Sequence, residues 1–391
     1  MKYLNANKVL SKDLISLIQK YYQGGCLYIP KENYRRAKRR TDYKIELEKR
    51  NKHIYLRHLE GKANEELGSI YHLAESSIRR ILLKERAEHQ KMEGIIKEIL
   101  KSWGIENGQL LQIYSSAWET DHSYIIKVYD NKEQLERNIK TTTILLNHNI
   151  PVAEILPTLT GEKFVSCQNK YFLVSKKLRG SNLSDLKDEK TAWNMGCAIA
   201  QLHKAFTECE KEIAFWDNSL LREMKGWVQE SLKKNEWQTV DKEQYLKAVR
   251  LLEETYDSLP KQLIHRDVHF GNFLFHEGEL SGYIDFDLSQ RNIRIFDICY
   301  FLTGLLAEET KEPLTKTDWM KNVKAVIAGY ESISMLSEEE KEAVPYVMEC
   351  IEIFFAAYFL EIQDTKCAND ANKIFQFVQA CEKEIQDAIK S

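Results

Sequence analysis

One short polar segment carries the residues best suited to chemistry. Residues 263–275 read LIHRDVHFGNFLF, so Asp267 and Asn272 stand in the spacing H-R-D-x-x-x-x-N. Asp285 follows within YIDFD, and Lys127 lies far upstream within YIIKVY. An aspartate can accept the proton of an attacking hydroxyl, an asparagine and a second aspartate can hold Mg²⁺, and a strand lysine can neutralise phosphates. The set predicts phosphoryl transfer from ATP, or GTP, with Mg²⁺ as the metal.

Each of these residues taken alone has a simpler explanation. A loop aspartate is usually a turn residue or a helix cap, and His265 is compatible with a place in the core. For Lys127 alone, an ordinary strand position with the ammonium group in water is the better interpretation. The joint pattern, with a short hairpin between Asn272 and Asp285, favours the kinase-like interpretation instead.

The surrounding pattern predicts the elements that position these residues. A small β-rich lobe is indicated by strand-like runs at residues 110–114, 124–129, 163–167 and 171–175. A helical stretch at residues 133–146 lies between the second and third of these runs. An amphipathic helix at residues 95–100, ending at Gly104, precedes the lobe. From Gly180 onward the chain is expected to be mostly helical, apart from a hairpin that turns at Glu277-Gly278.

Residues from about 92 to the C-terminus resemble the aminoglycoside phosphotransferase and choline kinase-like family, which includes homoserine and methylthioribose kinases. The resemblance rests on the H-x-D motif, the asparagine five residues later and the I-D-F segment. It implies an α+β, bilobal protein-kinase-like fold, with Asp267 as the catalytic base and Asn272 and Asp285 as metal ligands. A protein kinase is disfavoured, because IYSSAWETDHS lacks a G-x-G-x-x-G loop, D-F-D lacks the DFG glycine, and no APE follows.

The resemblance also implies further contacts in the nucleotide site. A short turn should meet the phosphates, and the segment between the lobes should meet the adenine through its backbone; the candidates are Ser115 and Ser116, then Ser175, Lys176 and Lys177. The helix glutamate that pairs with a kinase lysine has two candidates, Glu133 and Glu136, although Asn138 stands nearer the expected spacing. Asp287 is expected either at a second metal or as a cap, and Asp297 as a brace of the catalytic loop.

The substrate pocket is expected in the helical lobe, between residues 185–258 and the C-terminal helices. Candidate lining residues are Trp193, Trp216, Glu352, Tyr358, Glu361 and Asp364. An acidic and aromatic wall would suit a cationic small-molecule hydroxyl compound, such as an amino sugar or choline. The alternative, that the aromatic residues belong to the core and the glutamates to the surface, is the stronger one for these residues.

Charge divides the chain into two unequal parts. The net charge of −3 is the sum of +9 in residues 1–90 and −12 in the remaining 301 residues. Residues 45–88 are expected to form a helix-turn-helix, and residues 1–88 resemble the Mor transcription activator family through GGCLYIPK and LAESSIRRIL. Residues 1–22 and 26–30 are expected to form a helix and a strand, and a basic helix is expected to open near Glu75. The resemblance implies dimerisation through the N-terminal helix and strand, and DNA contacts. The expected DNA-binding residues are Ser76, Ser77, Arg79, Arg80, Lys84 and Arg86. A solvated basic surface on a dimerisation or docking bundle is the alternative.

Composition limits the remaining possibilities. A length of 391 residues with 43% hydrophobic residues suits two or three globular domains, which we place at residues 1–88, 92–179 and 180–391. The 8 cysteines form no CxxC pair, and we expect a reduced, cytoplasmic location with no membrane span. The leading hypothesis is a small-molecule kinase fused to a DNA-binding module. The alternative is a transcription regulator whose kinase-like domain senses a nucleotide or metabolite.

Overall fold

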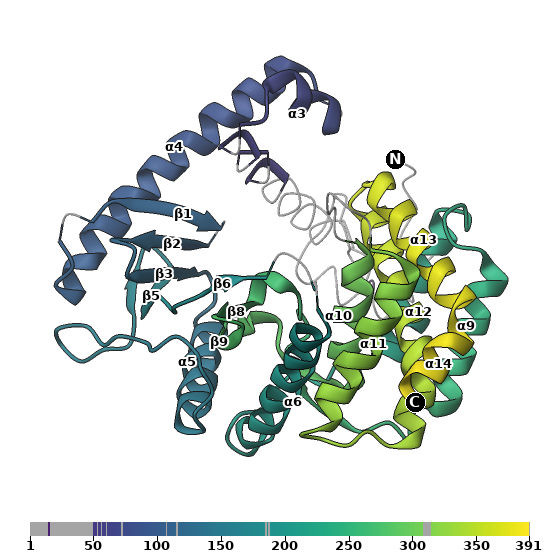
Figure 1. The fold of residues 1–391 in the computed structure, drawn as a ribbon. Helices are drawn as coiled ribbons and strands as arrows, with labels where there is room; N and C mark the ends of the chain where they lie inside the picture. Colours follow the sequence, from purple (N-terminus) through teal and green to yellow (C-terminus); the bar gives the residue numbers. More distant parts are fainter. Residues whose placement is uncertain are drawn as a thin grey trace. The chain divides into compact units, whose positions relative to one another are not determined.

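The computed structural model describes residues 50–52, 54–55, 57–59, 61–71, 73–106, 108–114, 116–183, 186, 188–307 and 314–390, together with Ile15. The chain divides into two units, Met1–Glu85 and Arg86–Ser391 (Figure 1). The boundary between them lies inside a long helix, and each unit is described by itself.

The described part of the first unit contains a helix-turn-helix. Residues 50–52, 54–55 and 57–59 are helical, α3 spans Asn64–Ile70, and α4 begins at Glu75. A Cβ atom on Gly68 would lie 2.8 Å from the carbonyl oxygen of Leu73, so the glycine permits this tight turn. The helices enclose a small core of Ile54, Leu67, Ile78, Ile81 and Leu82. The helix predicted near residues 1–22 and the strand predicted at residues 26–30 lie outside the described residues, apart from Ile15.

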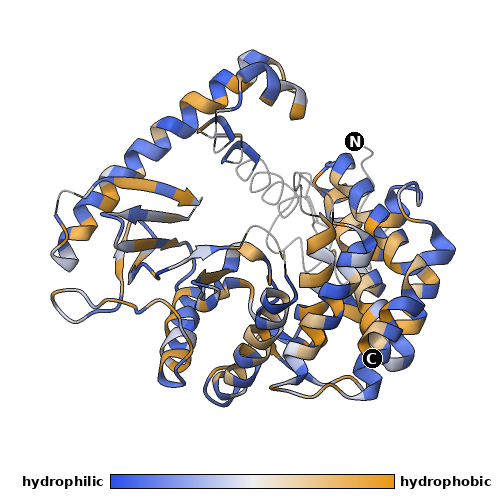
Figure 2. Ribbon diagram, in the orientation of Figure 1, coloured by the Kyte–Doolittle hydropathy of each residue, from blue (hydrophilic) through white to orange (hydrophobic). Residues whose placement is uncertain are grey.

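Helix α4 is longer than predicted. It spans Glu75–Leu100 without a break, whereas the sequence suggested one helix opening near Glu75 and another at residues 95–100. The change of composition near residue 90 does not interrupt the backbone, because KERAEHQKMEG consists mostly of good helix formers. Figure 2 shows α4 as mainly hydrophilic, with hydrophobic residues interspersed. Its predicted DNA-binding residues are exposed except for Ser77, and Arg79 pairs with Glu75 at 2.6 Å.

The second unit begins with a five-stranded antiparallel sheet in the order β1-β2-β3-β5-β4. The strands are Leu110–Tyr114, Ala117–Thr120, Tyr124–Tyr129, Lys170–Lys176 and Val165–Cys167 in that order. Strand β2 was not predicted, because its four residues are all buried and show no alternation. One face of the sheet packs on the end of α4 through Ile96, Leu100, Trp118, Ile126 and Phe172. Helix α5, Lys132–Asn147, packs through Leu135 and Ile139 against Tyr129 and Leu173.

Two small sheets lead into the larger lobe. Strands β7 and β10, Lys261–Ile264 and Gln290–Ile293, pair antiparallel, and Ile264 faces Gln290. A second sheet, in the order β6-β8-β9, contains Ser181–Asn182, Phe273–His276 and Glu279–Tyr283. The predicted hairpin is β8-β9, and it turns at Glu277-Gly278, which both have positive φ angles. Strands β6, β7 and β10 were not predicted, because they contain only two to four residues each.

The rest of the second unit is helical, as predicted. The helices are α6 Glu189–Glu212, α7 Leu220–Glu223, α8 Gln229–Lys234, α9 Lys242–Tyr256, α10 Ile295–Ala307, α11 Lys316–Glu331, α12 Glu338–Glu361, α13 Thr365–Ala380 and α14 Glu382–Lys390. One continuous hydrophobic core joins these helices to β7–β10. Among the described residues, α12 alone is long and apolar enough to cross a membrane, but 67% of its most apolar window is buried inside the lobe, as in a core helix.

Candidate active site

Three polar side chains surround Asp267, two from the loop after β7 and one from α10. The Tyr300 hydroxyl donates to Oδ1 of Asp267 at 3.0 Å, and Nδ2 of Asn272 donates to Oδ2 at 3.1 Å. Nε2 of His269 lies 3.6 Å from the same Oδ2 and 3.0 Å from Nδ2 of Asn272. Burial alone would raise the pKa of Asp267, but His269 and Tyr300 outweigh it and hold that pKa below its ordinary value. The carboxylate is therefore ionised at neutral pH.

Asp297, at the start of α10, holds the backbone of this loop. Its carboxylate is fully buried and accepts hydrogen bonds from the backbone N–H groups of His265 and Arg266, each at 2.8 Å. Nε2 of His203 lies 2.9 Å from the same carboxylate. Arg266 has a φ of +68°, an unusual conformation for a residue with a side chain, and its bond to Asp297 stabilises it. The brace predicted for Asp297 is thus observed.

His265 connects the loop to the segment that carries Asp285. Its Nε2 donates to the carbonyl oxygen of Ile284 at 3.0 Å, and its Nδ1 accepts from the backbone N–H of Asp267 at 3.3 Å. Burial lowers the pKa of His265, so the ring is neutral, which this donor–acceptor pattern requires. The backbone N–H of Ile284 also donates to the carbonyl oxygen of Asn272 at 3.0 Å.

These bonds bring Asp285 and Asn272 into one site. Nδ2 of Asn272 faces Asp267, and no residue in the described part of the chain contacts its amide oxygen, which is left as a ligand group. Asp285 has a φ of +64°, and its side chain is 45% exposed. One carboxylate and one amide oxygen suit Mg²⁺, which takes its other ligands from water and phosphate oxygens. The described residues contain no cluster of three or more His, Cys, Asp or Glu ligands that would form a closed metal cage.

Lys127, on β3, reaches across to this segment. Its Nζ lies 2.7 Å from Oδ1 of Asp285 and 3.1 Å from Oδ2 of Asp287. Burial would lower the pKa of Lys127, but Tyr129, Asp287 and Asp285 raise it well above its ordinary value. The ammonium group is therefore charged throughout the physiological range. The structure thus brings Lys127 and Asp285 together from positions 158 residues apart.

The predicted nucleotide-contacting residues come from two segments, the turn between β1 and β2 and the end of β5. Ser116 is exposed in the tight turn between β1 and β2, beside Ala117, which pairs with Lys127. Ser115 lies outside the described residues. Ser175 and Lys176 end β5. The backbone N–H groups of Lys176 and Lys177 already donate to the carbonyl oxygens of Glu154 and Ser123. The adenine contacts remain a prediction, and these two N–H groups are engaged within the chain.

The predicted substrate residues lie in different local environments. Glu352 is buried beside Thr303, and burial raises its pKa to about 7. Tyr358 is exposed, and Glu361 lies 3.3 Å from Lys234 at the surface. Trp193 and Trp216 are also exposed, and Asp364 caps α13 by accepting from the N–H of Cys367. The charge of Glu352 acts on Tyr300, which binds Asp267. Of this set, only Glu352 is connected to Asp267 by the contacts described.

Several residues around the loop had no signal in the sequence. Nδ2 of Asn182 donates to the carbonyl oxygens of Phe270 and Gly271 at 3.0 and 2.8 Å. Arg266 pairs with Glu223 at 3.2 Å and lies over the ring of Phe354 at 5.7 Å. A polar residue on a distant element is not identifiable from spacing alone. Of the residues missed, Tyr300 was the easiest to predict from the sequence, because it lies one helical turn after Asp297.

Comparison with known proteins identifies the family. The profile described as the phosphotransferase enzyme family matches residues 105–331, more than half of the chain. The chain belongs to this family. The family predicted from the H-x-D, Asn and I-D-F residues is confirmed, as is the prediction of a small-molecule kinase at the level of the family. The match begins at residue 105, so the resemblance of residues 1–88 to Mor proteins stays a prediction.

Individual relatives are distant. A homoserine kinase of Phenylobacterium zucineum is 36% identical over 90 residues, which are 22% of this chain and 25% of that protein. A homoserine kinase of Zymomonas mobilis is 26% identical over 249 residues, which are 61% of this chain and 73% of that protein. The match thus spans a quarter of the first relative and nearly three quarters of the second.

Solved structures share the fold at low identity. An amicoumacin kinase in complex with AMP-PNP, Ca²⁺ and Ami is 17% identical, with a TM-score of 0.56 and coverage of 78% of this chain and 96% of that one. A microcompartment-associated aminopropanol kinase is 14% identical, with a TM-score of 0.57 and coverage of 75% and 98%. These likenesses confirm the predicted kinase-like fold, with a small sheet-containing lobe and a large helical lobe.

Proposed function

We propose that the protein transfers the γ-phosphoryl group of ATP, or GTP, to a hydroxyl group of a small molecule. The observation that carries this proposal is the convergence of Asp267, Asn272, Asp285 and Lys127 in one site of a phosphotransferase-family fold. An ionised carboxylate, a cation-binding pair and a permanently charged lysine are the groups that phosphoryl transfer needs.

In this reaction Asp267 accepts the proton of the acceptor hydroxyl. The hydroxyl oxygen forms a bond to the γ-phosphorus, the bond from that phosphorus to the β–γ bridging oxygen breaks, and ADP leaves. Lys127 binds and positions the phosphates, and Asp285 and the amide oxygen of Asn272 would hold Mg²⁺. The metal supplies positive charge that offsets the charge on the transferred group. Tyr300 and Asn272 fix the orientation of the Asp267 carboxylate.

The proposed acceptor is a small amino-alcohol or amino sugar. The named relatives are homoserine kinases, and the structural neighbours include an aminopropanol kinase and a choline kinase. The net charge of −12 in residues 91–391 is compatible with a positively charged acceptor. The experiment is an ADP-release screen over homoserine, choline, aminopropanol, methylthioribose and aminoglycosides, with Asp267→Asn as the blank. Turnover that is equal in this variant and the wild type would overturn the proposal.

We propose further that residues 1–88 bind DNA. The helix-turn-helix of α3 and α4 and the exposed Arg80, Lys84 and Arg86 support this role. Mobility shifts at several salt concentrations test it, because phosphate contacts give a steep loss of affinity with salt. Charge reversal of Arg80 and Lys84 should abolish the shift; if it does not, residues 1–88 serve only as a docking or dimerisation unit. Ligand-dependent DNA binding that survives Asp267→Asn would favour the sensor alternative over the kinase.

A further inference from the structure

The lysine of this site lacks the helix glutamate that a kinase fold would supply. The two candidates on α5 lie at its surface, where Glu133 pairs with Arg137 at 3.5 Å and Glu136 with Lys132 at 3.1 Å. The position nearest the expected spacing holds Asn138, an uncharged residue. Neither of these two candidates pairs with Lys127, whose partners are Asp285 and Asp287. The fixed negative charge beside the lysine has to come from another element.

Asp287 provides a carboxylate at that place. Its Oδ2 accepts from Nζ of Lys127 at 3.1 Å, and its Oδ1 accepts from Nδ2 of Asn138 at 3.0 Å and from the Tyr129 hydroxyl at 3.3 Å. All three donors belong to the small lobe, on β3 and α5, whereas Asp287 follows β9 in the large lobe. Both oxygens of Asp287 are thus engaged by protein donors.

Asp285, two residues earlier, has a different environment. Its Oδ1 accepts from Lys127, and among the described residues no donor contacts its Oδ2. Its side chain is 45% exposed, against 23% for Asp287. A carboxylate with a free, exposed oxygen suits a cation, and a carboxylate saturated by three donors suits a fixed position. The two aspartates of the D-F-D segment therefore differ in the groups they can still bind.

We infer that Asp287 is the residue that positions Lys127, in place of a helix glutamate, and that Asp285 alone of this pair serves the cation. The inference rests on the proposed function, because it assigns the lysine to nucleotide phosphates. Asn138 and Tyr129 fix the Asp287 carboxylate, and the carboxylate fixes the ammonium group. When a cation engages Asp285, Asp287 keeps the lysine in place.

Nucleotide affinity measured without metal distinguishes the role of Asp287 from that of Asp285. The full chain is titrated with ADP in calorimetry, once with Mg²⁺ and once with a chelator. Asp287→Asn should weaken binding about tenfold under both conditions, since a charge-assisted contact to the lysine is lost. Its dependence on Mg²⁺ concentration should match that of the wild type. Asp285→Asn should weaken binding only in Mg²⁺ and raise the Mg²⁺ concentration required.

Three further variants guard against a general loss of structure. Glu136→Gln removes a carboxylate from α5 itself and should leave ADP affinity unchanged. Tyr129→Phe keeps the Asp287 charge but removes one of its donors, and should weaken metal-free binding about threefold. Asn138→Glu, placed in the Asp287→Asn background, restores a carboxylate near the lysine and should recover part of the affinity.

The outcomes are distinguishable. A loss in Asp287→Asn that occurs only in Mg²⁺, with a raised Mg²⁺ requirement, would make Asp287 a metal ligand and overturn the inference. Wild-type affinity in Asp287→Asn, or an equal loss in Glu136→Gln, would also overturn it. If the wild type itself binds neither ADP nor ATP, the proposed function fails and the inference fails with it.

Discussion

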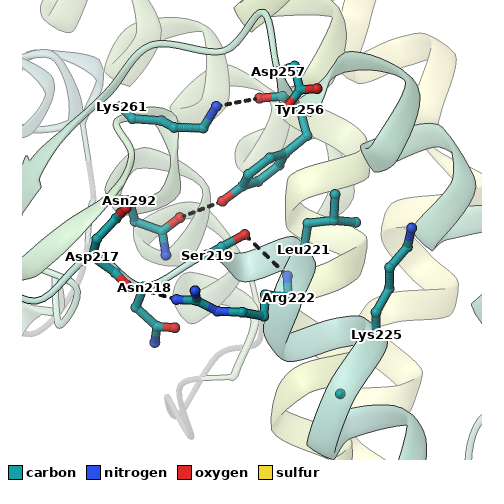
Figure 3. Close-up of a pocket in the computed structure, with 11 residues that line it drawn as sticks. Asp217, Asn218, Ser219, Leu221, Arg222, Lys225, Tyr256, Asp257, Lys261 and Asn292 are labelled. Atoms are coloured by element: carbon teal, nitrogen blue, oxygen red, sulfur yellow. Dashed lines mark hydrogen bonds between the residues drawn. The ribbon is translucent and has the colours of Figure 1, made fainter.

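The two ends of the ladder formed by β7 and β10 differ in what lies beside them, a polar loop at one end and a cavity at the other. At the end where Ile264 faces Gln290, the chain enters the loop that carries Asp267 and Asn272. At the other end, where Lys261 faces Ile293, the structure has a cavity of about 620 Å³ (Figure 3). Four paired residues separate them, a length of about 10 Å. This cavity and the proposed catalytic groups are therefore at different ends of the ladder.

Several polar groups around the cavity are paired with one another, although the buried Nδ2 of Asn292 has no partner among the described residues. Nζ of Lys261 donates to the carbonyl oxygen of Tyr256 at 3.0 Å, and the Tyr256 hydroxyl donates to Asn292 at 3.1 Å. Nη2 of Arg222 donates to the carbonyl oxygen of Asp217 at 2.8 Å. At the loop end, by contrast, Asp285 and Asn272 retain oxygens that no described residue contacts. Function is better located by such free ligand groups than by the size of a hollow.

Asp297→Ala should have the largest effect on the loop end. It removes a buried carboxylate that holds two backbone N–H groups and His203, and such losses cost about 3–5 kcal/mol. Urea denaturation measures the loss, with Asp217→Ala at the cavity end as the matched control. Equal stability of the two variants would remove the distinction between the ends.

Tyr300→Phe should lower kcat about tenfold without changing the KM for nucleotide, because it removes one donor to the carboxylate of Asp267, the proposed catalytic base. Loss of that donor also raises the pKa of Asp267, so the fall in activity at acid pH should begin at a higher pH than in the wild type. The pH–rate profile measures this shift. An unchanged acid limb would show that Tyr300 only fills space.

Glu352 makes stability depend on pH. Burial raises its pKa to about 7 in the folded chain, above its ordinary value. The folded state therefore holds a proton that the unfolded state releases between about pH 4.5 and 7, so this group favours folding at low pH and its contribution is lost as pH rises through 7. The Tm of Glu352→Gln should fall less over this range than that of the wild type. Parallel Tm curves would contradict the assignment.

Substitutions in the cavity should have the smallest effect. Arg222→Ala and Lys261→Met change groups that bond to neighbouring backbone and touch none of the four proposed catalytic residues. We expect kcat and KM within about twofold of the wild type, since substitutions away from a site shift free energies by about 0.5 kcal/mol. A tenfold change in either constant would show that the cavity end takes part in the reaction.

The parts of the site that lie close together in the sequence were predictable. Asp267 and Asn272 share one loop, and Asp285 follows after one hairpin, so spacing alone revealed them. The partners of these residues come from distant elements: Tyr300 lies 33 residues from Asp267, and Asp287 lies 160 from Lys127. Such pairs depend on how the helices and sheets pack, which local patterns do not encode.

The fold was predictable to a similar extent. Strands β1, β3 and β5 and helix α5 show clear periodicity and were found within one or two residues of their ends. The short strands β2, β7 and β10 were missed, because four residues carry too little pattern. The continuity of α4 was missed, because a change in composition was interpreted as a break in the helix.

The most direct test of the account is a single-turnover measurement on Asp267→Asn. The full chain is given γ-labelled ATP, Mg²⁺ and an acceptor on which the wild type is active, and ADP affinity is measured alongside. We predict transfer slowed by at least about 10³-fold, as expected when a catalytic base is lost, with ADP affinity unchanged. Transfer at the wild-type rate with normal ADP affinity would contradict the assignment of Asp267 as the base.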